Sequence, residues 1–180
     1  PYTPASNYPV QLRNIAGNLL RTSKGKLTVE YERDGVTASD IVVCYPMDEI
    51  HIPNIYQRDE PLFKLLGNNI GYLYLGSIQG GKVPSNLPTK GLIIDLRCYP
   101  DYEKVKGYWT YNALYPDRYP FAKITRGSSR YPGLFTYQYT VEIGKKNKNH
   151  YKGKIVLLVN EITQSHAEYV AMRYQAIPNT

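Results

Sequence analysis

Residues 154–172, KIVLLVNEITQSHAEYVAM, decide how the rest of the chain is interpreted. Residues 155–159 are a continuous apolar run rich in β-branched side chains, which predicts a strand buried on both faces. Residues 160–164 are a short polar turn. From Ser165 onward the apolar residues recur at helical spacing, so a helix is expected to begin there.

The serine at this junction has two interpretations. A strand, a tight turn and a serine at a helix start can expose a nucleophile, because the first free N–H groups of the helix can face a developing oxyanion. Ser165 and Glu168 also form a capping-box pattern, in which the glutamate carboxylate reaches back to the start of the helix. Capping is the commoner role for such a pattern, so both interpretations stay open.

Composition narrows the class of protein. A chain of 180 residues makes one domain, or one domain and part of another. The net charge is +7, but the basic residues are scattered and the dense run at 145–152 predicts a solvated loop, so no nucleic-acid partner is expected. No apolar run is long enough for a membrane span. Cys44 and Cys98 lie beside apolar strands without metal-ligand spacing, which predicts free thiols, no metal site and no cofactor.

The first part of the chain predicts a helix within residues 10–20 and a hairpin with strands at 26–32 and 40–45. Residues 46–68 are polar and interrupted by prolines, and are predicted to be a linker. Further strands are expected at 69–76, 121–125 and 134–143.

A second apolar strand, KGLIIDLR at residues 90–97, ends in charged residues. The common interpretation of such an ending is a buried parallel strand whose Asp95 and Arg97 pair with each other. Because its run does not alternate, we expect it to lie beside residues 156–158 in a mostly parallel sheet.

Together, these strings resemble a known family. VNEITQSHAE at residues 159–168 and KGLIIDLR at 90–97 are similar to two signatures of the C-terminal processing (tail-specific) serine peptidases. The strand IGYLYLG at 70–76 is similar to the strand that opens their protease core. The helix and hairpin upstream resemble the last third of a PDZ domain.

The resemblance implies a fold and an activity. The fold would be α/β, with a ClpP/crotonase-like core whose central sheet is mostly parallel, preceded by a partial PDZ-like helix and β-hairpin. The expected organisation is a partial PDZ-like segment at 1–45, a linker at 46–68 and the N-terminal part of the peptidase core at 69–180. The activity would be serine endopeptidase action on peptides or exported proteins in a bacterial envelope or periplasm. An oligomer is left open.

The resemblance also assigns residues. Ser165 matches the nucleophile, and the backbone N–H groups of His166 and Asp101 match the oxyanion donors. The family has two glycines after the second strand, whereas this chain has Asp101 and Tyr102. The family's general base is expected outside residues 1–180, because no lysine follows Lys154 and the ring of His166 points about 100° away from Ser165 on a helix.

Two other functions compete with the peptidase. A non-catalytic module that binds peptides or proteins and retains the fold is favoured by the changed glycine loop. A structural α/β domain in which Ser165 only caps a helix is the third interpretation. We expect the sequence beyond Thr180 to distinguish the three functions. A Phe-Gly-Lys-Gly motif there would favour a Ser–Lys dyad peptidase and a distal glutamate a tricorn-like peptidase, whereas neither would favour the binding module.

Overall fold

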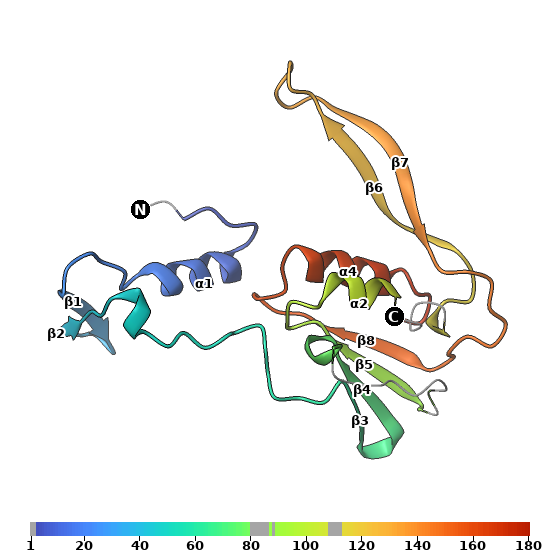
Figure 1. The fold of residues 1–180 in the computed structure, drawn as a ribbon, viewed down its shortest axis with the longest axis horizontal. Coiled ribbons are helices and arrows are strands. Elements are labelled where there is room, and N and C mark those ends of the chain that lie inside the picture. The colour runs from blue at the N-terminus through green and yellow to red at the C-terminus, as the bar shows by residue number, and fades with distance from the viewer. Residues whose placement is uncertain (1–2, 80–86, 88, 108–112) are drawn as a thin grey trace. The chain divides into compact units, whose positions relative to one another are not determined.

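A computed structural model describes residues 3–79, 87, 89–107 and 113–180. The chain forms two compact units, Pro1–Asn54 and Ile55–Thr180, called here the N-terminal and C-terminal units. Figure 1 shows their elements.

The N-terminal unit consists of helix α1 (Tyr8–Asn18), strands β1 (Lys26–Arg33) and β2 (Val36–Val43), and the 3₁₀ turn η1 (Met47–Glu49). Asn7 caps α1, because its side-chain oxygen accepts the N–H of Val10 at 3.0 Å. The hairpin turns at Asp34 and Gly35, which both have positive φ. The predicted helix and hairpin are confirmed, with β2 beginning earlier than expected. No residue described in this unit is buried, so the unit has no core of its own.

The C-terminal unit is mixed α/β, and its four-stranded sheet has the order β3-β4-β5-β8. These strands are β3 (Phe63–Leu66), β4 (Ile70–Tyr74), β5 (Gly91–Asp95) and β8 (Lys154–Leu158). The 3₁₀ turns η2 (Gly67–Asn69) and η3 (Leu75–Ser77) flank β4. β3 and β4 are antiparallel, whereas β5 is parallel to both of its neighbours. Ile93 pairs with Val156 and Ile94 with Leu157, which confirms the predicted parallel arrangement.

The prediction that residues 155–159 are buried on both faces is wrong. Ile155 is buried, but Val156 is 45% exposed and Val159 is 55% exposed. β8 lies at the edge of the described sheet, and α4 packs against it. A continuous apolar run is therefore not sufficient evidence for a central strand, because an edge strand packed on one face can carry the same run.

The predicted linker at 46–68 is divided between the two units. Residues 46–54 belong to the N-terminal unit, whereas residues 55–60 lie in the C-terminal unit as a segment without helix or strand, called here the strap. Phe63–Leu66 forms β3. Side-chain contacts hold the strap instead of a helix or a strand ladder, so its sequence has no periodicity by which it could be recognised.

The remaining described elements are helices and a long hairpin that projects away from the sheet in Figure 1. They are α2 (Tyr102–Gly107), α4 (His166–Gln175), and the long hairpin of β6 (Tyr119–Gly127) and β7 (Phe135–Ile143), drawn in orange in Figure 1. One hydrophobic cluster joins α4 to the sheet and includes Leu73, Ile94, Leu96, Ile155, Val170 and Tyr174. In the described part of the chain, no helix has the length and apolar character needed to cross a bilayer.

Strand β5 is mostly buried and its partner β8 is partly exposed, which allows a test of the edge position of β8. Replacing Ile94, which is fully buried, by Ala should lower the free energy of unfolding by about 3 kcal/mol. Val156→Ala should lower it by less than about 1 kcal/mol, because that side chain is already half in water. Urea unfolding of both variants provides the measurement. Equal losses would mean that β8 is covered in solution.

Candidate active site

A short loop, residues 159–165, carries the chain from β8 to α4. The loop closes on itself, because the N–H of Thr163 donates to the carbonyl of Asn160 at 3.0 Å. The N–H of Asn160 donates in return to the Thr163 hydroxyl oxygen at 3.1 Å. This reciprocal pair of hydrogen bonds holds the turn that places Ser165 at the start of α4.

Thr163 also connects this loop to the neighbouring strand. Its hydroxyl donates to the carbonyl of Leu96 at 2.9 Å, and the N–H of Leu96 donates to the carbonyl of Leu158 at 2.9 Å. Thr163 is buried, so these bonds are shielded from water. The two strand ends therefore meet, as expected of parallel neighbours in one sheet.

Ser165 has an unusual backbone for a helix cap. Its φ is 51° and its ψ is −111°, whereas the cap residue Asn7 has the usual extended values of −156° and 168°. A positive φ is strained for a residue with a side chain and costs on the order of 1–3 kcal/mol. Ser165 is also exposed to solvent. A strained, exposed serine on a strand-to-helix turn is the geometry of a nucleophile elbow.

The capping pattern is present as well. The N–H of Ser165 donates to the Glu168 carboxylate at 2.7 Å, which is the glutamate half of a capping box. This bond helps to hold the strained residue in place. Ser165 is therefore both a helix cap and a strained residue. A purely structural role explains the cap but does not explain the strain.

No general base contacts the serine hydroxyl within the described part of the chain. The one carboxylate bonded to Ser165 is Glu168, through the backbone N–H. The His166 ring instead packs beside Tyr99 and Tyr169, with centroid distances of 6.4 and 6.5 Å. Burial and the charge of Arg173 lower the pKa of His166, against an opposing effect of Asp101. The packing of the ring between Tyr99 and Tyr169 is consistent with the expected orientation of His166 away from the hydroxyl.

Asp101, the other expected oxyanion donor, directly precedes α2. Its carboxylate accepts the N–H of Lys104 at 3.0 Å and the side-chain amide of Gln79 at 2.8 Å. The carboxylate is thus committed to the helix cap. The N–H of Asp101 donates to no other residue that the structure describes. Sequence analysis missed this cap, although an aspartate directly before a helical segment is its usual signal.

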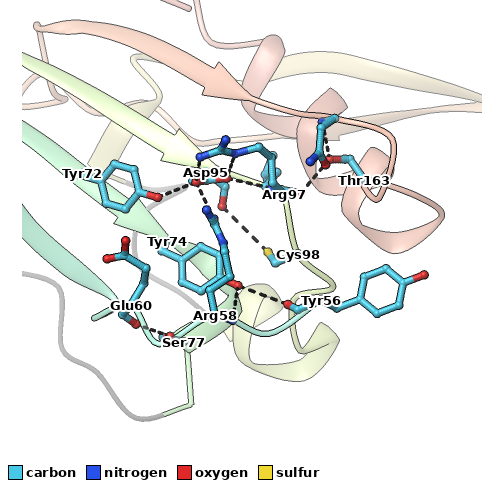
Figure 2. A network of polar contacts seen from close by, with 12 residues as sticks. Tyr56, Arg58, Glu60, Tyr72, Tyr74, Ser77, Asp95, Arg97, Cys98 and Thr163 are labelled. Carbon is cyan, nitrogen blue, oxygen red and sulfur yellow. Dashed lines mark hydrogen bonds and ion pairs between the residues drawn. The ribbon is translucent and has the colours of Figure 1, made fainter. Parts of the chain in front are cut away.

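A charged network surrounds Asp95 at the end of β5 (Figure 2). Its fully buried carboxylate accepts hydrogen bonds from Arg58 at 2.7 Å and from the Tyr72 hydroxyl at 2.5 Å. Arg97 donates three more, from its backbone N–H at 2.9 Å, Nε at 3.0 Å and Nη2 at 2.7 Å. The pairing of Asp95 with Arg97 expected from the sequence is therefore formed, but two further partners join it.

These bonds keep Asp95 ionised. Burial by itself would raise the pKa of the carboxyl, but the hydrogen bonds from Arg97, Arg58 and Tyr72 outweigh it and hold the pKa well below its usual range. A carboxylate this strongly stabilised is a poor proton acceptor. Asp95 is therefore a structural anion and not a candidate general base.

The network anchors the strap to the sheet. The Arg58 guanidinium lies 4.4 Å from the centre of the Tyr74 ring, and the Arg58 N–H donates to the Tyr74 hydroxyl at 3.2 Å. That hydroxyl donates in turn to the carbonyl of Tyr56 at 3.2 Å. The Tyr56 hydroxyl accepts the side-chain amide of Gln164 at 2.7 Å. The strap thus reaches the residue directly before Ser165.

Sequence analysis missed Arg58, Tyr56 and Tyr72 as parts of this site. Arg58 and Tyr56 lie in the segment predicted to be a linker, and Tyr72 is one of 19 tyrosines. No local pattern pairs any of them with Asp95 or Gln164, because their partners are distant in sequence.

The other reactive groups do not form a competing site. Burial raises the pKa of the Cys98 thiol to about 12, which keeps it protonated, and both cysteines are free. Within the described ranges, no group of three or more His, Cys, Asp or Glu side chains could hold a metal ion.

Removing the charge of Asp95 tests whether the network stabilises the fold. Asp95→Asn should lower the free energy of unfolding by about 2–3 kcal/mol, because two guanidinium groups lose their buried counter-ion. The native pKa lies below the unfolded one, so the wild type should lose this advantage as the pH falls below about 4. Asp59→Asn, an exposed change in the same strap, is the matched control. A loss no larger than that of the control would contradict the anchoring role.

Backbone strain at Ser165 gives a second test. Glycine relieves a positive φ, so Ser165→Gly should leave the free energy of unfolding unchanged or raise it by about 1 kcal/mol. Ser165→Ala keeps the strain and loses the hydroxyl, so it should lower that free energy by about 1 kcal/mol. Thermal unfolding of the three proteins measures both. A Gly variant less stable than the Ala variant would show that the serine is not strained.

The C-terminal unit thus presents an exposed serine on a strained turn, held by Thr163, Glu168 and the strap. No protein-family model matches this chain, and no curated protein matches it in sequence.

Proposed function

We propose that this protein is a serine peptidase in which Ser165 attacks the peptide bond. The observation that carries the proposal is the positive φ of an exposed, non-glycine residue at the junction of β8 and α4. Strain of this kind persists where the surroundings hold it and is concentrated at functional sites. A serine that served only as a cap would adopt the extended backbone of Asn7.

The surroundings suit acyl transfer. The developing oxyanion would lie at the N-terminus of α4, where the N–H of His166 is the first donor beyond the serine. The N–H of Asp101 is the proposed second donor, since its loop follows β5, the strand beside β8. The carboxylate of Asp101 is bound to Lys104 and Gln79, which limits its repulsion of the oxyanion.

The resemblance to the C-terminal processing peptidases refines the proposal. It gives a ClpP/crotonase-like core, a partial PDZ-like N-terminal unit, peptides or exported proteins as substrates, and a bacterial envelope as the location. The parallel pairing of β4, β5 and β8 agrees with such a core. The lack of a buried residue in the described N-terminal unit agrees with part of a larger domain.

The mechanism requires a general base in addition to the residues that the structure describes. A serine hydroxyl is a weak nucleophile at neutral pH without a base that removes its proton. The described histidines, lysines and carboxylates do not contact the hydroxyl of Ser165. A lysine or histidine from another part of the protein or another chain would therefore complete the site.

A peptide-binding module without catalysis is the second candidate. It is favoured by Asp101 and Tyr102, which stand where the family has two glycines. At Asp101 a side chain narrows the space in which a substrate carbonyl could approach the backbone, compared with a glycine.

Labelling with a fluorophosphonate probe distinguishes the two functions. Protein produced from the whole gene should label covalently and hydrolyse peptides, and Ser165→Ala should lose both. Ser129→Ala, an exposed serine in the hairpin turn, should behave as the wild type. Peptide binding without labelling would support the binding module, and peptide hydrolysis by the Ser165→Ala variant would refute the nucleophile.

A further inference from the structure

Helix α4 carries two stripes of non-charged side chains, although packing on the core requires only one. Ala167, Val170 and Tyr174 form the buried stripe. His166 and Tyr169, three residues apart, form a second stripe that is half-buried. A helix face outside the core usually carries charged side chains. The second stripe thus lies outside the buried core, and its side chains are partly accessible to solvent.

Rings from three other segments extend this stripe into a continuous row. Tyr99 lies 6.4 Å from His166 between ring centroids, and Tyr56 lies 6.0 Å from Tyr99. On the other side, Phe121 of β6 lies 5.3 Å from Tyr169. We call these five residues the aromatic row: Tyr56, Tyr99, His166, Tyr169 and Phe121. Tyr99 is 48% exposed and the others are half-buried, so the row is accessible from solvent.

The row is uncharged but has a cation at one end. The Arg173 guanidinium lies 5.8 Å from the centre of the Phe121 ring and 5.9 Å from that of Tyr169. A second cation on these rings would be repelled, although aromatic faces by themselves attract cations. Burial and Arg173 lower the pKa of His166, which favours the neutral imidazole at neutral pH. The surface therefore favours a neutral, apolar ligand over a basic one.

We infer that the aromatic row binds a large neutral side chain, aromatic or aliphatic, of a peptide substrate. This inference rests on the proposed function, because it takes Ser165 to be the point of attack. His166 lies in the middle of the row and directly follows Ser165 in the chain, so the bound side chain would belong to a residue next to the bond that is cleaved. The five residues would then determine specificity, while Ser165 performs the chemistry.

Peptide binding tests the row without requiring catalysis. Dansyl-labelled tetrapeptides with Phe, Ala, Lys or Glu at one position are titrated at pH 7.5, and the dissociation constants are compared. The Phe peptide should bind most tightly and the Lys peptide most weakly. Tyr99→Ala should weaken binding of the Phe peptide about five- to tenfold, the usual value of one aromatic pair. Tyr99→Phe, which keeps the ring, should retain the preference.

Tyr139→Ala is the matched control, because Tyr139 is an exposed tyrosine on β7 outside the row. Circular dichroism of each variant shows whether its fold is intact. Tighter binding of the Lys or Glu peptide, or an equal loss in the Tyr139→Ala variant, would overturn the inference. Selective binding of the Phe peptide without fluorophosphonate labelling would support the row and refute the peptidase. If Ser165 is labelled but the preference for the Phe peptide is unchanged in the Tyr99→Ala variant, the binding role of the aromatic row is refuted and the peptidase is not.

Acidification offers an independent check on His166. The groups that face its ring are Tyr99, Tyr169, Arg173 and Asp101. Protonation adds a second cation beside Arg173, so the preference for the Phe peptide over the Ala peptide should fall on acidification. Because the pKa of His166 is lowered, the fall should begin below the usual pH range of imidazole titration. The same preference at pH 5 and pH 7.5 would contradict the inclusion of His166 in the row.

Discussion

The carboxylate of Asp95 is the group on which the rest of the site depends. It is fully buried at the end of a strand, and a buried charge is tolerated only when it is paired and hydrogen-bonded. Arg97 alone could have satisfied it locally. Arg58 of the strap and Tyr72 of the neighbouring strand also donate hydrogen bonds to it. One anion therefore links three segments that are not adjacent in the chain. The strap has no strand ladder of its own, and this charge pairing is a principal contact holding it against the sheet.

From that anchor a chain of hydrogen bonds leads to the serine. Tyr74 bonds to the backbone of Tyr56, and Gln164 bonds to the hydroxyl of Tyr56. Thr163 adds a second attachment, to the carbonyl of Leu96. A residue with positive φ is maintained only when its surroundings hold it more strongly than the strain drives it to relax. Contacts on both sides of Ser165, from Thr163 and Glu168, meet that requirement.

The edge position of β8 explains why the apolar run after Lys154 misled the burial prediction. Its residues pack on α4 from one face, while Val156 and Val159 remain largely exposed. The strand that leads to Ser165, β8, thus lies at the edge of the described sheet. The aromatic row includes His166 and Tyr169 of α4, so its central residue directly follows the strained serine in the chain.

Local patterns in the sequence were sufficient to locate the two parallel strands, the N-terminal hairpin, the helix after Ser165 and the pairing of Asp95 with Arg97. Each depends on residues a few positions apart, whose spacing expresses strand or helix periodicity directly. Tertiary structure alone decided the partners of Asp95, the strap at 55–60, the edge position of β8 and the gathering of Tyr99, His166 and Phe121. These depend on contacts between residues up to 108 positions apart in sequence, as between Tyr56 and Gln164. The backbone angle of Ser165 belongs partly to the same class, because the turn before it is held by the long-range bond from Thr163 to Leu96 as well as by the local bond to Glu168.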